Sequence, residues 1–279
     1  MRCIGFLLSL LCAAAALGAQ PDLAILVRQS IANQDRDWRE GIHWRYTQAD
    51  TNYSGDVKHI EVSEVIPLFG TPYERLIAKD GHALSPDEEK REEHKYQKAL
   101  DQRQKESAAE RAARVKKYQN ERSFLKDLPN AYDFALLGEE AVDGRPAWIV
   151  GMTRRAGFTP ATSRGSMLKH LEGKLWIDKQ DVQWAKAEAH VIDPIGIGWI
   201  LARVGPGAEI HLSLTRVAEG LWMPASIEVT GGVRVLMVHR KKLDEQVAFS
   251  EYVRSEKDTG VHVSGGHAPA NVPTKGSFR

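Results

Sequence analysis

The sequence predicts a mainly β domain of antiparallel strands, preceded by one helix and interrupted by a long charged helical insertion. Apolar and polar residues alternate over many short runs, which is the pattern of strands with one buried face. Turn signals such as Asp80-Gly81, Asp143-Gly144 and Gly231-Gly232 separate these runs. About ten runs recur at a spacing of about 8–12 residues, which is typical of an all-β sandwich or barrel. The short turns favour antiparallel pairing.

Residues 1–19 have the pattern of a cleavable signal peptide. Arg2 supplies one positive charge, an apolar run extends from Cys3 to Leu17, and small residues follow at Gly18-Ala19. This is the order of a charged region, an apolar region and a cleavage site. The run is short for a membrane span, which needs about 20 apolar residues, although an uncleaved anchor is the alternative. The sequence therefore predicts a periplasmic or secreted protein.

The mature chain has no cysteine, because both cysteines, Cys3 and Cys12, lie in the signal segment. It can form no disulfide and has no thiol nucleophile. Without Arg2, the 38 basic side chains become 37, equal to the 37 acidic ones. A neutral chain does not favour nucleic acid as a partner. The remaining length of about 260 residues suffices for a large core, in one large β domain or in two smaller ones.

The mature chain opens with an expected helix from Pro21 to Trp38. Pro21 is suited to a first helical position, and apolar residues follow at helical spacing. A half-buried strand is expected next, at 42–47, where Ile42, Trp44 and Tyr46 alternate with polar residues. Two further strands are expected at 59–65 and 74–79.

The segment 85–126 differs in composition from the sequence around it, being dense in Lys, Arg, Glu and Gln. Ser85 is suited to cap a helix and Pro86 to begin it. The apolar residues form only a thin stripe: Tyr96, Leu100, Ala108, Ala112 and Val115. One long or two shorter surface helices are expected, with little contribution to the core. The mixed charge is typical of a solvated face, and a mobile lid or a docking arm is the functional alternative.

Strands are expected again after Pro129. They are placed at 132–136, on both sides of the Asp143-Gly144 turn, and at 174–179, 184–192, 209–217, 221–229, 233–239 and 247–254. Apolar residues become sparse from Ser255 onward, which predicts a disordered tail over 255–279. The resulting organisation is a signal peptide at 1–19 and a single β domain at 20–254 with a helical insertion at about 85–128.

The sequence contains none of the common catalytic or phosphate-binding motifs. Two carboxylate pairs, Glu139-Glu140 and Asp178 with Asp181, could supply an acid and a base. Carboxylates beside turns are more often solvated. Ten histidines are scattered along the chain, and a metal site would need several of them to converge. We therefore expect no catalytic residues, no metal and no cofactor.

Large apolar residues are the better candidates for a binding site. Trp176 lies on the polar-patterned side of its strand with Lys174 and Asp178, which suggests that a helix or a ligand covers that side. The run 195–201 is apolar on all sides. It is either a buried strand or a flexible flap that lines a cavity mouth or touches a membrane or a partner. The candidate cavity or lid residues are Trp44, Tyr46, Phe134, Trp148, Trp176, Ile197 and Trp199.

The order of these elements and three short segments resemble the LolA-like group. The segments are GKLWIDK at 173–179, VID at 191–193 and FSEY at 249–252. The likeness extends from about Asp22 to Arg254 and is one of pattern. The group includes periplasmic lipoprotein-sorting factors and related sensor domains.

The resemblance implies a curved, incompletely closed antiparallel β-barrel with helices that cap its hollow side. It implies that the hollow accepts acyl chains, and it carries over no catalytic residue. The charged insertion departs from the compact sorting factors. The leading hypothesis is a non-enzymatic carrier or sensor that binds an acyl chain, a lipid or a lipoprotein in an apolar cavity. The alternatives are an envelope protein that docks on a protein partner through its charged helices, around a filled core, and, last, a hydrolase.

Overall fold

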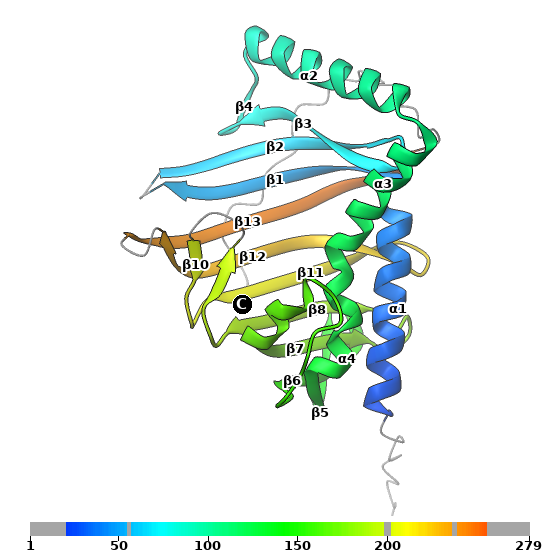
Figure 1. The fold of residues 1–279 in the computed structure, drawn as a ribbon, viewed down its shortest axis with the longest axis vertical. Coiled ribbons are helices and arrows are strands. Elements are labelled where there is room, and N and C mark those ends of the chain that lie inside the picture. The colour runs from blue at the N-terminus through cyan, green and yellow to red at the C-terminus, as the bar shows by residue number, and fades with distance from the viewer. Residues whose placement is uncertain (1–20, 55–56, 198–201, 236–238, 256–279) are drawn as a thin grey trace, which may run out of the picture.

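The computed structural model describes residues 21–54, 57–197, 202–235 and 239–255. The expected signal peptide and most of the expected tail lie outside these residues. One antiparallel sheet forms the body of the chain, with helices packed across it (Figure 1). Its strands follow the order β4-β3-β2-β1-β13-β12-β11-β8-β7-β6-β5, and β10 and β9 extend it beside β12. The terminal strands β4 and β5 do not pair, so the sheet is open and not a closed barrel.

The strand bounds agree with the expected pattern at most positions. The strands are β1 (Trp44–Ser54), β2 (Val57–Leu68), β3 (Thr71–Lys79), β4 (His82–Ala83), β5 (Tyr132–Val142), β6 (Arg145–Arg154), β7 (Leu171–Asp178), β8 (Trp184–Val191), β9 (Ile195–Ile197), β10 (Ala202–Val204), β11 (Glu209–Ala218), β12 (Leu221–Val235) and β13 (His239–Arg254). The turns expected at Asp80-Gly81 and Asp143-Gly144 are confirmed, because each lies between two paired strands.

The turn expected at Gly231-Gly232 is wrong. Strand β12 continues through both glycines, which pair with Leu243 and Lys242 of β13. Gly231 has a φ of 148°, and a Cβ there would lie 2.4 Å from the Cβ of Ala208. Glycine is therefore required at this position because another segment packs closely on the strand, and not because the chain reverses.

The helices are α1 (Leu23–Gly41), α2 (Pro86–Lys105), α3 (Ala108–Gln119), α4 (Leu128–Ala131) and the 3₁₀ segments η1 (Asn120–Lys126) and η2 (Gly165–His170). Helix α1 begins two residues after Pro21, because the side chain of Asp22 accepts hydrogen bonds from the backbone N–H groups of Ala24 and Ile25 at 2.9 and 3.1 Å. Such a cap satisfies donors that the first turn leaves free. The expected first helix is thus confirmed, with its end extended to Gly41.

The main core lies between α1 and one face of the sheet, which we call the inner face. Leu26, Val27 and Ile31 of α1 pack with Val150 of β6 and Leu175 of β7. Because side chains of a strand alternate between faces, strands such as β6 and β7 contribute to this core from one face only. Figure 1 shows α1 and the segment from α3 to α4 running across the strands, whereas α2 lies at the other end, beside β3 and β4.

The charged insertion contributes more to the core than its composition indicates. It forms two helices, as expected, but Tyr96 of α2 is only 1% exposed and packs with Ile66 and Leu68. Leu125 of η1 is buried in the main core beneath α1. A guanidinium from α2, that of Arg103, donates hydrogen bonds to the carbonyl oxygens of Leu68 and Thr71 at 2.9 and 3.0 Å. The expectation that this segment contributes little to the core is therefore wrong.

Gly173 is a point of close strand contact where we expect a single methyl group to destabilise the protein. A Cβ there would lie 2.0 Å from the carbonyl oxygen of Glu188 and 2.9 Å from the Cα of Ala189 on β8. Backbone atoms must shift to admit it, so Gly173→Ala is expected to lower the free energy of unfolding by about 2 kcal/mol. Unfolding in guanidinium chloride measures this loss. Gly232→Ala is the matched control, because no atom lies within 4 Å of its Cβ position. Equal stabilities of the two variants would contradict the prediction.

Candidate functional site

An apolar row crosses the inner face in the middle of the sheet. Leu212 of β11 pairs with Ile227 of β12, which pairs with Val247 of β13, and all three side chains are half-buried. Val229, two residues along β12 from Ile227, lies on the same face beside Ile210. Leu212 packs against the core under α1, which places the whole row on the inner face.

This row lies between two apolar clusters. One is the core beneath α1; the other joins Leu171, Val191, Val204 and Ala208 near β9 and β10. Of the apolar residues named so far on this face, three are half-buried and belong to neither cluster. We call this set the inner-face strip: Ile227, Val229 and Val247.

Aromatic side chains continue the strip toward α1. Phe249 lies two residues after Val247 on β13, and its ring centroid is 6.0 Å from that of Tyr46. Tyr252 lies 5.1 Å from Tyr46 and donates a hydrogen bond to the carbonyl oxygen of Pro224 at 2.6 Å. Burial, with the nearby Glu74 carboxylate, raises the pKa of Tyr46 to about 12. The phenol itself is therefore neutral at pH 7.

A small cavity separates these aromatic residues from α1. It has a volume of about 40 Å³, and Trp38, Tyr46, Tyr118 and Trp222 contribute to its walls. A cavity needs about 10–15 Å³ to admit one water molecule. This space is therefore large enough for water but too small for an acyl chain. An acyl chain bound on the inner face would therefore lie on the strip, or α1 and α3 would have to move apart.

Trp176 lies on the opposite face, which we call the outer face. It is 4% exposed, and its Nε1 donates a hydrogen bond to the Glu140 carboxylate at 2.6 Å. The ammonium groups of Lys186 and Lys174 lie 4.5 and 5.9 Å from the ring centroid. Side chains of the sheet itself thus cover Trp176, so its burial requires neither the helix nor the ligand that the sequence suggested.

The structure distributes the other candidate residues over two ends of the inner face. Trp44 and Tyr46 share the inner side of β1, two residues apart. Phe134 and Trp148 pack against the core on β5 and β6, at the far end of the sheet. Ile197 belongs to β9 by its backbone. Its side chain, and Trp199 entirely, lie outside the described residues.

The sequence did not single out the inner-face strip. Its only signal was the alternation along 209–217 and 221–229, which gives the face of each residue but not its neighbours. The strip exists because β11, β12 and β13 pair in one register.

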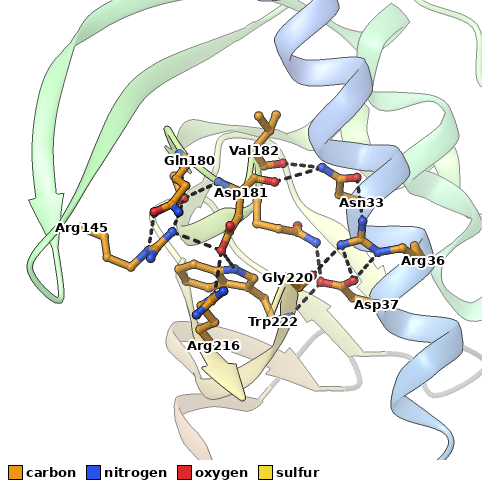
Figure 2. Close-up of polar contacts among 12 residues, drawn as sticks. Asn33, Arg36, Asp37, Arg145, Gln180, Asp181, Val182, Arg216, Gly220 and Trp222 are labelled. Atoms are coloured by element: carbon orange, nitrogen blue, oxygen red, sulfur yellow. Dashed lines mark hydrogen bonds and ion pairs between the residues drawn. The ribbon is translucent and has the colours of Figure 1, made fainter. Parts of the chain in front are cut away.

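One of the two carboxylate pairs that the sequence offered as acid and base, Asp178 with Asp181, ties elements together (Figure 2). Asp178 accepts two hydrogen bonds from Arg145 at 2.7 and 2.8 Å, and Asp181 accepts one from each of Arg145 and Arg216 at 3.1 Å. The Trp222 indole also donates to Asp181, at 2.9 Å. Burial alone would raise the pKa of Asp178, but the hydrogen bonds from Arg145 and from backbone N–H groups hold it below its ordinary value.

A second buried carboxylate, Asp37, fixes α1 to the sheet in the same region (Figure 2). It accepts hydrogen bonds from the backbone N–H of Trp222 and from Nε of Arg36, both at 2.9 Å, and from the amide of Gln183. Burial raises the pKa of Asp37, although these donors oppose the shift. These hydrogen bonds from the sheet and from α1 hold the helix in place on the inner face.

Two general features of the described residues bear on the site. They contain no group of three or more His, Cys, Asp or Glu side chains arranged to hold a metal ion. None of their helices is both long and apolar enough to cross a bilayer.

No protein-family model matches the sequence, and no curated protein matches it. Solved structures match over most of the chain but with low TM-scores. A lipoprotein-sorting protein domain from Vibrio parahaemolyticus is 10% identical, with a TM-score of 0.34, over 81% of this chain and 92% of that one. A LolA superfamily protein from Nitrosomonas europaea is 10% identical, with a TM-score of 0.33, over 81% and 94%. The MucA/MucB complex of Pseudomonas aeruginosa gives 12% identity and a TM-score of 0.24, over 80% and 93%.

These structural neighbours include members of the LolA superfamily, which is the group that the sequence resembles.

Proposed function

We propose that this chain is an exported binding protein of the cell envelope that holds an acyl chain on the inner-face strip. The observation that carries the proposal is the position of Ile227, Val229 and Val247, which are apolar and half-buried between two packed clusters. Partly exposed apolar residues that lie together are typical of surfaces that bind apolar groups. The neutral aromatic cluster around Tyr46 extends this surface along β13.

Burial of an acyl chain on this surface would provide enough free energy for micromolar binding. Burial of an acyl chain contributes about 0.8 kcal/mol per methylene group. About ten methylene groups would contribute roughly 8 kcal/mol before the loss of chain freedom, and micromolar affinity corresponds to about 8 kcal/mol. Affinity is therefore expected to rise with chain length until the surface is covered. The two terminal strands, β4 and β5, do not pair with each other, so strand pairing does not close the sheet over its inner face.

Two substitutions on β13 test the proposal with a matched control. Val247→Ser places a hydroxyl on the inner-face strip, whereas Val253→Ser changes a residue that is 51% exposed on the outer side. We expect Val247→Ser to weaken the binding of fatty acids of ten or more carbons by about threefold to tenfold, and Val253→Ser to leave it unchanged. Intrinsic tryptophan fluorescence and the shift in melting temperature measure the binding.

A complete absence of binding by fatty acids, phospholipids and lipopeptides would contradict the proposal. The alternative would then be an envelope protein that docks on a protein partner through α2. That helix is dense in exposed charge outside Tyr96, and its N-terminal turn carries Asp87, Glu88 and Glu89. Mass spectrometry of an organic extract of the purified protein distinguishes a bound lipid from an empty protein.

A further inference from the structure

A second cavity lies on the side of α1 that faces η1, away from the inner-face strip. Its volume is about 470 Å³, which is within the range of small-molecule sites. Successive turns of α1 supply Arg28, Ala32, Asp35 and Arg39, which recur at helical spacing on one side of the helix. Segment η1 closes the other side with Asn120, Arg122, Ser123, Leu125 and Lys126. We call this cavity the α1–η1 groove.

The lining of the groove is strongly cationic. Four basic side chains, Arg28, Arg39, Arg122 and Lys126, face one acidic side chain, Asp35. Arg39 forms an ion pair with Asp35, so this acidic group is already engaged. Within the part of the chain that the structure describes, the other three cations have no carboxylate as an ion-pair partner. The groove therefore has three positive charges to offer an anion.

Arg122 is the central group of the groove, because the protein holds its guanidinium in place without neutralising it. It donates one hydrogen bond, to Oε1 of Gln34 at 3.1 Å, and it stacks on Trp38 with 5.2 Å between the guanidinium carbon and the ring centroid. The Gln34 amide is itself fixed, because it donates to Oε1 of Gln183 at 2.9 Å. Trp38 stacks on Tyr118 at 4.6 Å. Both neighbours of Arg122 are thus rigid.

This arrangement leaves Arg122 with unused donors. A guanidinium carries five N–H groups in a planar fork that matches a carboxylate or a phosphate. A half-buried cation that makes no direct ion pair is costly. Burial lowers the pKa of Arg122, and the charges of Tyr118, Asp35 and Asp37 offset this shift only in part. A bound anion would remove this cost, because charge-assisted hydrogen bonds to a fixed guanidinium are strong.

We propose that the α1–η1 groove is a binding site for an oxyanion, with Arg122 as the central donor and with Arg28 and Lys126 at the rim. The oxyanion is a phosphate group, either free or as the head group of an amphiphile. Gln119, Asn120 and Ser123 offer further polar contacts, and Ile31, Leu125 and Pro129 form an apolar wall beside them. The lining of the groove shares no residue with the inner-face strip, although Arg122 also borders the small cavity beside Tyr46.

Isothermal titration of the mature chain with inorganic phosphate, decyl phosphate and decyl maltoside tests the proposal. Decyl phosphate is expected to bind through the groove, and its affinity should fall as salt is added because exposed charges are screened. Inorganic phosphate that binds as tightly as decyl phosphate would identify the free anion as the ligand, whereas weaker binding would identify an amphiphile head group. Both results support the oxyanion site.

Three variants place the binding in the groove. Arg122→Gln should weaken phosphate or decyl phosphate binding about tenfold or more, and the exposed pair Arg28→Gln with Lys126→Gln should weaken it about threefold. Lys117→Gln is the matched control: it removes one positive charge from α3 outside the groove lining and should leave binding within about twofold. If Arg122→Gln does not fold, the double variant Arg28→Gln with Lys126→Gln tests the site instead. Both of these side chains are exposed, so their replacement should leave the fold intact.

Two outcomes overturn the inference: neither phosphate compound binds, or the rim pair binds both as tightly as Lys117→Gln. The result is separable from the proposed function. Val247→Ser should weaken acyl ligands of any head group, decyl maltoside included, and should not alter the binding of inorganic phosphate.

Discussion

Replacement of Arg145 by Met is expected to lower the free energy of unfolding by about 3 kcal/mol at pH 7. The guanidinium makes two hydrogen bonds to Asp178 and one to Asp181. Asp178 is 1% exposed and would become a buried carboxylate without a counter-ion. The expected loss is at the lower end for buried ion pairs, because the Arg145 side chain is 26% exposed.

The loss should depend on pH in a definite direction. The pKa of Asp178 is lowered in the folded protein, so its contribution to stability is present above its ordinary pKa and disappears as the pH falls through the lowered value. In Arg145→Met, burial still raises the pKa of Asp178, and the guanidinium no longer opposes that shift. The difference between the two proteins should therefore be full well above the raised pKa of Asp178 in the variant, and it should shrink as the pH falls from that pKa to the lowered pKa in the wild type. Asp37, whose pKa is raised, gives the opposite trend in both proteins and cancels.

Unfolding in guanidinium chloride, followed by tryptophan fluorescence, measures this effect. The double variant Arg145→Met with Asp178→Asn should recover part of the loss, because it removes the uncompensated charge. Lys95→Met is the control: this lysine is 64% exposed and pairs with Glu92 at the surface, where ion pairs contribute about 0–1 kcal/mol. A deficit that is the same at every pH would show that Arg145 acts by packing on Trp222 and not by its charge.

Replacement of Tyr96 by Ala should lower the free energy of unfolding by about 3–4 kcal/mol, close to the value for other buried aromatic residues. The ring is 1% exposed, packs with Ile66 and Leu68, and lies 5.5 Å from the ring of Tyr73. The substitution leaves a cavity where α2 meets the sheet, so α2 should detach at lower denaturant concentrations than in the wild type. Hydrogen exchange of the α2 amides, measured together with global unfolding, distinguishes local detachment from global loss.

Tyr53→Ala is the matched control, because this tyrosine is 40% exposed on β1 and should change stability by less than about 1 kcal/mol. A similarly small effect of Tyr96→Ala would mean that the insertion attaches loosely to the sheet. That result would restore the interpretation of the charged segment as a detachable lid or docking arm. The large effect that we expect would make α2 a fixed part of the fold.

Local chemistry explains which features could be read from the sequence. The Asp143-Gly144 turn, the apolar side of α1 and the capping residue Ser85 each act through neighbours a few residues away. Ser85 and Glu88 form a reciprocal cap at the start of α2. Such interactions depend on short-range backbone geometry, so pattern alone predicts the mainly β class, the first helix and the helical insertion.

Contacts between distant segments decided the rest. Gly231 lies within a strand that pairs with β13, and it is glycine because Ala208 packs on it. Trp176 is buried because Lys186 and Glu140 cover it. Tyr96 anchors a segment whose composition is that of a solvated helix. The inner-face strip and the α1–η1 groove have the same origin. Alternation and helical spacing give the face of each side chain, but only strand register and helix packing decide which faces meet, because those pairings join residues far apart in the chain.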